Sequence, residues 1–467
     1  EINKEGNILN AEFKIPLASL RYDDKSIKWR VNIYKTDVGK NKRSTWARIP
    51  RNLSVAGLAF MGDLYFEKPL GKSKTPVFLI PYVSGTQGKD FDKKKIVSFF
   101  DVGIDSKLSL GSGLTLDLTL NPDFSQVEVD DQIINLSRFE VRLPEKRQFF
   151  LQNSDLFSSF GSSYNAQPFF SRRIGVAKDL EGNNIQNRII AGARLSGKIN
   201  KNLRLGLLNM VTDSDPKNKI SSNNNTVLAV QQKLFSRSFL GAFFLNREKI
   251  GEDEFTNDQE DFNRVLGVDY NLQSKDNKWV GKAWYHKSFE TNNNENNFSN
   301  GFRIYYNSRK NNFRLFTGQK SEKFASDLGF IQRTGVKSHF LNYSHRLWID
   351  SKKIRSIELS QQLYLVNKPN LTNLITDRNY ETKGEISFMN QSKLELQYNR
   401  KYTFLLKSFD PVGGDNSIPL PSNTGFYYND VEIGFTSNYS KDFYFNFRST
   451  IGGFYSGKRV SFNTELT

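Results

Sequence analysis

Apolar and polar side chains alternate residue by residue in many segments of this chain, and this period of two constrains its fold more than any other feature. In residues 114–120 leucine occupies every second position, and Thr115, Asp117 and Thr119 fill the positions between. Residues 392–402 repeat the pattern, with leucine and tyrosine on one face and charged or amide side chains on the other. Strict alternation is typical of β-strands whose two faces meet different environments.

The alternating segments follow one another without a change of composition. About 18 candidate strands can be counted from residue 76 onward, whereas a soluble β-sandwich domain uses about seven to nine. This series favours an all-β fold built on one large antiparallel transmembrane β-barrel at residues 75–467, because closure removes exposed strand edges. The alternation is clearest at 114–120, 189–199, 357–365, 392–402 and 443–451. Weaker versions occur near 76–86, 96–108, 203–212, 224–236, 238–249, 263–273, 279–289, 302–309, 313–319, 336–349, 380–389 and 424–436.

Composition agrees with a barrel and argues against other classes. Mean hydropathy is −0.57, and no stretch approaches the ~20 apolar residues of a membrane-spanning helix; barrel strands are polar on average because their faces alternate. The net charge is +17, but lysine and arginine are spread along the chain, so we expect no nucleic-acid partner. An electropositive lumen, or loops facing anionic surface polysaccharide, accounts for this charge better.

Residues 121–175 break the alternation and combine dense charge with many aromatic residues. We interpret this segment as a luminal plug or constriction, because a buried position inside a barrel gives both kinds of side chain partners. Its carboxylates could serve as general acid and base, but pairing with nearby cations in a luminal network is the favoured interpretation. The predicted network consists of Asp123, Glu128, Asp130, Glu140, Glu145, Arg147, Arg172 and Arg173.

The sequence carries no motif of a known catalytic or metal centre. His286, His339 and His345 are too far apart for a zinc signature, and the acidic run 128–131 lacks the spaced oxygen ligands of a calcium loop. There is no cysteine, and neither a nucleophile elbow nor a phosphate-binding loop occurs. We therefore predict a protein that is not an enzyme and that needs no metal or cofactor.

The segment 121–175 and a second motif carry a resemblance to a known family, DUF5916. The similar positions are Asn121-Pro122-Asp123-Phe124, Gln126-Val127-Glu128, Asn135-Leu136, Glu140, Pro144-Glu145-Lys146-Arg147, Phe149-Phe150, Ser171-Arg172-Arg173-Ile174-Gly175, Asp327-Leu328-Gly329-Phe330 and Arg333. The resemblance implies an outer-membrane protein of the Bacteroidetes type, which pairs a family-9-like carbohydrate-binding domain with a C-terminal barrel. Residues 1–65 resemble the C-terminal part of that domain, a β-sandwich. We therefore expect the chain to be truncated at both ends, with more barrel strands in the full protein.

Two tryptophans of the N-terminal part are candidates for sugar contact. Trp29 and Trp46 could stack on a pyranose ring, although tryptophans in a small sandwich more often form its core. Their role as sugar contacts stays a hypothesis at this point.

These features lead to three hypotheses about function. The leading one is a plugged or gated channel of the bacterial outer membrane, linked to glycan or polymer handling at the cell surface; Arg188, Arg194, Lys198 and Arg448 on lumen faces favour anionic solutes. The second is a non-transporting scaffold subunit of an outer-membrane secretion or assembly complex. The third is a barrel-borne hydrolase, which requires reactive side chains converging at one rim. The expected partners are outer-membrane lipid, surface polysaccharide and other outer-membrane proteins.

Overall fold

The computed structural model describes residues 2–6, 8–17, 20, 22–37, 42–49, 58–71, 77–90, 95–111, 113–122, 139–162, 166–182, 184–251, 261–291, 295–411, 417–438, 441 and 443–467. None of the helices within these ranges is long and apolar enough to span a membrane.

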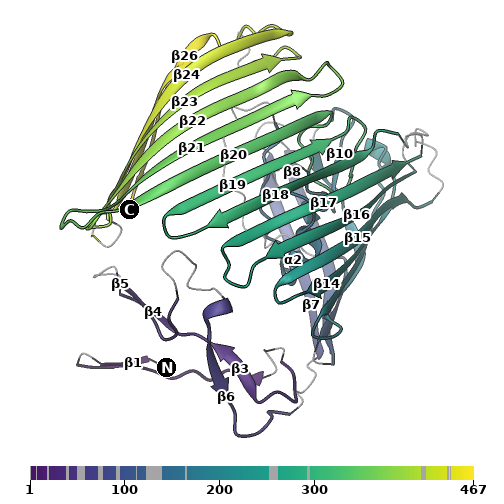
Figure 1. Cartoon of the computed structure of the whole chain (residues 1–467). Coiled ribbons are helices and arrows are strands. Elements are labelled where there is room, and N and C mark those ends of the chain that lie inside the picture. The colour runs from purple at the N-terminus through teal and green to yellow at the C-terminus, as the bar shows by residue number, and fades with distance from the viewer. Residues whose placement is uncertain are drawn as a thin grey trace.

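One antiparallel sheet of 18 strands forms a barrel and dominates the described chain (Figure 1). From β7 to β26, each barrel strand pairs with the barrel strand that follows it in the described chain. β9 pairs in this way with β12, and the irregular segment 121–175 and the separate β10–β11 hairpin lie between them in the sequence. The strands are β7 Val77–Asp90, β8 Lys95–Leu110, β9 Leu114–Leu120, β12 Ile189–Lys198, β13 Leu203–Thr212, β14 Asn223–Leu234, β15 Ser238–Lys249, β16 Phe262–Gln273, β17 Trp279–Glu290, β18 Phe298–Asn307, β19 Asn311–Lys320, β20 Val336–Trp348, β21 Ile354–Lys368, β22 Leu374–Phe388, β23 Lys393–Leu405, β24 Thr424–Thr436, β25 Phe445–Phe454 and β26 Gly457–Leu466. The predicted large antiparallel barrel is thereby confirmed.

The two faces of this wall differ in the way that the alternation predicts. On β9, Asp117 is buried and faces the interior, while Leu118 and Leu120 are 39% and 57% exposed on the outside. The same outward exposure of apolar side chains recurs around the barrel, at Leu207, Leu228, Leu240, Leu266, Val268, Phe302, Leu341, Leu359, Leu396, Ile433, Ile451, Val460 and Phe462. A sheet that pairs its own backbone groups and turns an apolar face outward is the form in which strands cross outer membranes. The protein is therefore an outer-membrane barrel.

The connections at the two ends of the barrel differ in length. At one end of the barrel the strands are joined by tight turns, such as residues 199–202. At the other end they are joined by long loops, such as residues 213–222 and 321–335. In such barrels the short turns face the periplasm and the long loops face the outside. The Asp23 carboxylate lies 3.9 Å from Nζ of Lys201, which belongs to the tight turn 199–202. This contact places Asp23 at the short-turn end of the barrel.

The N-terminal part forms small two-stranded sheets, drawn below the barrel in Figure 1. Its elements are β1 (Ile2–Glu5) paired with β2 (Ile8–Ala11), β3 (Lys28–Val31) paired with β6 (Gly62–Tyr65), β4 (Tyr34–Asp37) paired with β5 (Lys42–Thr45), and the 3-10 helix η2 (Leu58–Phe60). The assignment of residues 1–65 to a carbohydrate-binding β-sandwich stays a prediction.

Candidate functional site

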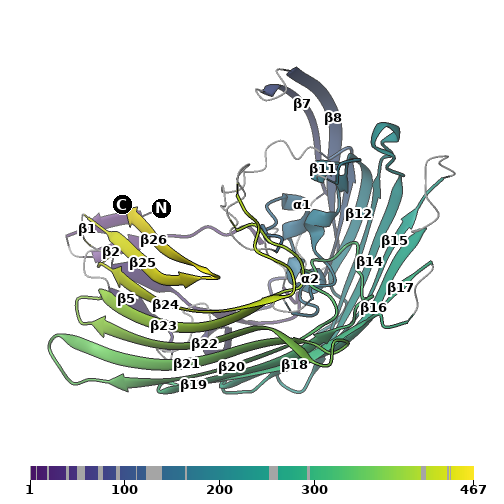
Figure 2. The same cartoon turned by 90° about the horizontal axis from the view of Figure 1, so that it is seen from above.

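We call residues 121–175, which lie between β9 and β12 in the sequence, the insert. Their described part contains the helices α1 (Gln148–Leu151) and α2 (Ser154–Ser158) and the 3-10 turn η3 (Ser171–Arg173). Figure 2 shows α1 and α2 on the concave side of the wall, and α2 contacts β13 and β14. The described part of the insert therefore lies in the lumen.

Apolar side chains of the insert and of the inner wall form one core. Phe157 and Phe160 are buried in it, and two wall glycines make room for their rings. A Cβ atom on Gly206 would lie 2.7 Å from the Phe157 ring, and one on Gly241 would lie 2.9 Å from the Phe160 ring. These contacts are closer than carbon atoms tolerate, so the wall is shaped to receive the insert. The wall residues of the core are Ile189, Leu208, Met210, Val227, Ala229, Phe243, Leu245 and Val265.

A buried ion pair holds the end of α1 against β9 and β12. The Arg194 guanidinium, 2% exposed, donates to the Asp117 carboxylate at 2.8 and 3.2 Å. Its remaining Nη donates to the backbone oxygen of Gln152 at 2.9 Å, and its charge lies 5.1 Å from the ring centre of Phe149. The arginine thus joins wall and insert while its own charge is neutralised.

A second buried cluster holds the turn that follows α2. The Asp269 carboxylate accepts from Lys282 Nζ at 2.9 Å, from His286 Nε2 at 2.6 Å and from the backbone N–H of Gly161 at 2.8 Å. Lys282 also donates to the backbone oxygen of Ser159. One carboxylate on β16 therefore collects two wall side chains and one backbone group of the insert.

Two further polar contacts tie α2 to the wall. Arg204 on β13 donates to both carboxylate oxygens of Asp155, at 2.6 and 3.1 Å. The Asn153 amide donates to the Ser196 hydroxyl at 3.0 Å. Since Ser196 lies on β12 and Arg204 on β13, the start of α2 is held to two neighbouring strands of the wall.

Besides the barrel wall, the insert also contacts the loop between β19 and β20, residues 321–335. Gln167 and Phe330 exchange both backbone hydrogen bonds, at 3.2 and 2.8 Å, as neighbouring residues of an antiparallel pair do. The Ser326 hydroxyl donates to the backbone oxygen of Pro168 at 2.6 Å.

The same loop continues these contacts toward the wall. Arg173 Nε donates to the backbone oxygen of Gly329 at 2.9 Å, and Asp327 pairs with Arg247 of β15 at 2.6 Å. The sequence motifs at 171–175 and 327–330 are therefore parts of one packed unit, although they are far apart in the chain.

One pair of the predicted luminal network lies in the centre of the described insert. Glu145 and Arg147 form an ion pair of 2.7 Å, and the Ser171 hydroxyl donates to Glu145 at 2.6 Å. Burial by itself raises the pKa of Glu145, but the hydrogen bonds and charge of Arg147, together with the Ser171 hydroxyl, outweigh it and hold that pKa below its usual value. Glu145 is thus bound as a carboxylate.

Other predicted network residues have separate partners. Arg173 pairs with Glu140 at 2.6 Å, and Arg172 donates to the backbone oxygen of Pro144 at 2.8 Å. The predicted residues Asp123, Glu128 and Asp130 lie outside the described residues. That the whole set forms a luminal plug stays a prediction.

The two candidate sugar-stacking tryptophans have different surroundings. Trp29 packs between the rings of Tyr22 and Phe66, with centroid distances of 5.2 and 5.1 Å. Trp46 is 61% exposed, and its ring leans on Gly62, where a Cβ would lie 2.5 Å away. Trp29 therefore has the environment of a small aromatic core, and Trp46 has a free ring face.

A cavity of about 1400 Å³, which we call the vestibule, opens at the long-loop end beside the insert. Loop residues of 213–222 and 321–335 and the hairpin of β10 (Val176–Lys178) and β11 (Asn184–Gln186) line it, together with Arg173 and Ile174 of the insert. Its polar lining includes Asn187, Asn218, Asn223, Asn225, Lys178, Lys219, Arg247 and Lys249. The insert thus forms one side of a polar chamber on the outer face.

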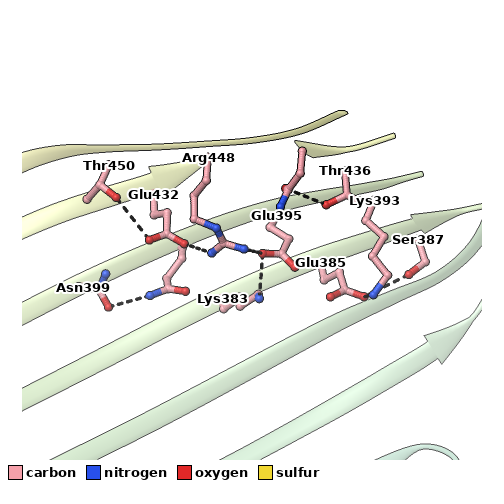
Figure 3. A network of polar contacts seen from close by, with 12 residues as sticks. Lys383, Glu385, Ser387, Lys393, Glu395, Asn399, Glu432, Thr436, Arg448 and Thr450 are labelled. Carbon is pink, nitrogen blue, oxygen red and sulfur yellow. Dashed lines mark hydrogen bonds and ion pairs between the residues drawn. The ribbon is translucent and has the colours of Figure 1, made fainter. Parts of the chain in front are cut away.

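The wall formed by β22–β25 carries a group of ion pairs, several of which are drawn in Figure 3. Glu395 accepts from Arg448 at 3.0 Å and from Lys383 at 3.1 Å, and Arg448 also pairs with Glu432. The residues that we call the charged strip are Lys383, Glu395, Lys401, Asp430, Glu432 and Arg448. They face the lumen, because Leu394, Leu396 and Tyr398 of β23 are exposed on the opposite face.

Three of the four cations that the sequence placed on the lumen face, Arg188, Arg194 and Arg448, lie beside carboxylates, while Lys198 is exposed at the end of β12. Arg194 is neutralised by Asp117, Arg448 by Glu395 and Glu432, and Arg188 lies 4.0 Å from Asp213. Alternation predicts that such arginines face the lumen, but it does not identify the carboxylates with which they pair. The lumen wall is therefore zwitterionic at these positions.

The Asp269–His286 pair has the geometry of two members of a catalytic triad but not the access. The two side chains are 1% and 0% exposed beneath the insert, and within the described part of the chain Nδ1 of His286 has no hydrogen-bond partner. No group of three or more metal-ligating side chains occurs in the described ranges. The pair holds the insert and is closed to a substrate.

Comparison with known proteins gives one family match. A family model described as "Domain of unknown function (DUF5916)" matches residues 74–467, and no curated protein matches the chain.

Several solved structures are similar in outline at low identity. Pseudomonas aeruginosa OpdQ is 9% identical with a TM-score of 0.33, over 85% of this chain and 96% of that one. Acinetobacter baumannii OccAB3 is 9% identical with a TM-score of 0.31, over 84% and 99%. Pseudomonas aeruginosa OpdK, solved with vanillate, is 11% identical with a TM-score of 0.30, over 84% and 94%.

Proposed function

The chain belongs to the family described as a domain of unknown function, DUF5916, and from that premise we propose that it is a transport-type barrel of the outer membrane. In this proposal the insert is a luminal plug that gates the barrel, and the vestibule receives the solute on the outer side. The solutes are surface glycans or their fragments, and the protein works among outer-membrane lipid, surface polysaccharide and other outer-membrane proteins.

The observation that carries the proposal is the uneven attachment of the described part of the insert to the barrel wall. Asp117, Asp269 and their partners tie it to β9–β17, whereas Arg448 in the charged strip stays 43% exposed inside the barrel. Exposed polar side chains along one inner wall are what a water-filled solute path requires.

The chemistry of the attachments supports an insert that can undock. Replacing a buried ion pair by apolar residues is often neutral or stabilising, so stability alone does not call for ionic attachments such as Arg194–Asp117 and Lys282–Asp269. Charged groups can separate into a wet lumen and be solvated there, whereas the apolar core around Phe157 and Phe160 resists separation. The ionic attachments therefore suit a gate, and the apolar core sets the cost of opening it.

A disulfide across the Gln167–Phe330 pair tests this function. Cα atoms of a hydrogen-bonded antiparallel pair lie about 5.5 Å apart, within the range that a disulfide spans, and the chain has no other cysteine. We expect the reduced Gln167→Cys/Phe330→Cys protein, reconstituted in planar bilayers, to open as the wild type does. The oxidised protein should lose these openings, and each single variant should be insensitive to oxidation.

Deletion of residues 125–165 is the complementary arm of this experiment. The deletion variant should conduct more than the wild type, because the gate is gone while the strands remain. Equal and negligible conductance in the wild type, the deletion variant and both redox states would overturn the transport function. Stoichiometric co-purification of other outer-membrane proteins under the same conditions would then select the scaffold function.

A further inference from the structure

Five aromatic side chains gather at the long-loop end of β23–β26, and we call this cluster the aromatic mouth. Its centre is Tyr455, whose ring centroid lies 5.8 Å from Phe409, 5.6 Å from Phe426, 5.6 Å from Tyr428 and 4.9 Å from Phe454. All five side chains are half-buried. The rings therefore pack on one another and still present part of their faces.

The backbone at Tyr455 is unusual for so large a residue. Its φ is +54°, in the left-handed region that glycine and asparagine occupy at low cost and bulky side chains rarely adopt. A glycine or asparagine would make the turn between β25 and β26 with less strain. A strained bulky residue is characteristic of functional positions, and here the strain places a ring among four others.

The aromatic mouth faces the lumen. Tyr428 stands two residues before Asp430 on β24, and Phe454 stands four residues after Thr450 on β25, so period two puts them on the inner face. The outward neighbour Tyr427 is 66% exposed on the lipid side. The rings are therefore not part of the lipid-facing surface.

The charged strip continues directly from the aromatic mouth along the same strands. Asp430 and Glu432 follow Tyr428 on β24, and Thr450 donates to Glu432 at 3.4 Å. The six charges of the strip are three carboxylates, Glu395, Asp430 and Glu432, and three cations, Lys383, Lys401 and Arg448. The strip offers donors and acceptors without a net charge.

We propose that the aromatic mouth and the charged strip form a binding site for a neutral oligosaccharide. The C–H faces of a pyranose ring stack on exposed aromatic faces, and its hydroxyl rim needs donors and acceptors in alternation, which paired carboxylates and cations supply. The charges of the strip are paired with one another, so a charged polymer would have to displace these ion pairs, and Arg459, 5.0 Å from the Phe454 ring centre, adds one donor at the aromatic mouth. Lipid meets only the outer face. This inference rests on the proposed transport function for the route by which the sugar arrives.

Binding to the full chain in detergent micelles tests the site without requiring transport. The probes are maltohexaose, cellohexaose and mannohexaose, each titrated calorimetrically into the wild type and into two matched variants. Tyr428→Leu removes a lumen-facing ring, and Tyr427→Leu removes the adjacent lipid-facing ring on the same strand. We expect at least one hexaose to bind, Tyr428→Leu to weaken it about tenfold, and Tyr427→Leu to leave it unchanged.

A second variant guards against loss of folding. Tyr455→Asn keeps a residue suited to a positive φ but removes the central ring, so the barrel should remain folded while hexaose binding weakens. Binding of no hexaose, equal weakening by Tyr427→Leu, or equally tight binding of a neutral aromatic tripeptide would each overturn the oligosaccharide site. A protein that binds no hexaose but opens and closes in bilayers would keep the transport function and lose only this inference.

Discussion

The ammonium nitrogen of Lys282 lies 2.9 Å from the carboxylate of Asp269, although the two side chains are only 2% and 1% exposed. They lie on neighbouring strands, β17 and β16, beneath the turn that follows α2. Neither charge is in contact with bulk water, so each depends on the other and on Ser159 and Gly161 of the insert.

The first prediction follows from this mutual dependence of Asp269 and Lys282. Asp269→Asn leaves the Lys282 charge buried without a counter-charge, at a cost of about 3–5 kcal/mol. We expect the insert to detach, measured as faster proteolysis within residues 148–160. Asp269→Asn/Lys282→Met removes both charges and should recover a large part of the protection. A double variant as labile as Asp269→Asn alone would show that the ion pair does not hold the insert.

The second prediction concerns the space that glycine leaves in the wall. Gly206→Ala places a Cβ 2.7 Å from Phe157, and overpacking of this kind costs about 1–3 kcal/mol. The insert should become more accessible to protease while the barrel still migrates as a folded species. Gly85→Ala is the matched control, because its Cβ would meet no atom within 4 Å. The same loss in both variants would contradict the close fit at Gly206.

The third prediction separates the two faces of one strand. Leu396→Arg puts a charge on the lipid side, where Leu396 is 57% exposed, and should destabilise the barrel by about 2–4 kcal/mol near the bilayer centre. Gln397→Arg puts the same side chain on the lumen side and should change stability little. The measurement is urea unfolding in lipid bilayers. Equal destabilisation by both would mean that the orientation of β23 is wrong.

The fourth prediction is a pH dependence in the insert. A carboxyl whose pKa is lowered by folding stabilises the folded form above its unfolded pKa and loses that contribution as the pH falls through the folded value. The pKa of Glu145 is lowered from 4.5, so the insert should stay docked at neutral pH and loosen as the pH falls below about 4.5. Glu145→Gln should loosen it at neutral pH and flatten this dependence. Protection of residues 139–162 from proteolysis is the readout.

The barrel could be predicted from the sequence because alternation is a local property of each strand. Residues 424–436 were predicted with the bounds that β24 has. The last strand, 457–466, was missed, because a glycine-lysine-arginine start and Thr464 interrupt its alternation, although Val460 and Phe462 keep it. The short helices α1 and α2 were not predicted either, because four or five residues are too few to show a helical period.

The partners within the site could not be predicted in the same way. Alternation placed Arg194 on the lumen face, but only the pairing register of β9 with β12 brings Asp117 to it. In the same way, only the register of β16 with β17 brings Asp269 to His286. Similarly, the motif at 171–175 and the motif at 327–330 were recognised separately. Their contact depends on a loop that follows eight further barrel strands, β12 to β19, and a contact at such a distance leaves no pattern in the local sequence.

The pairing of Gln167 with Phe330 also has a consequence for biogenesis. The insert is synthesised well before residues 326–330, yet its backbone partners lie there, 158 positions later in the case of Ser326 and Pro168. Docking therefore cannot be completed until β19 has formed and the chain has turned back. The newly made segment must wait, solvated, while the barrel assembles, and its many charged residues keep it soluble during that delay.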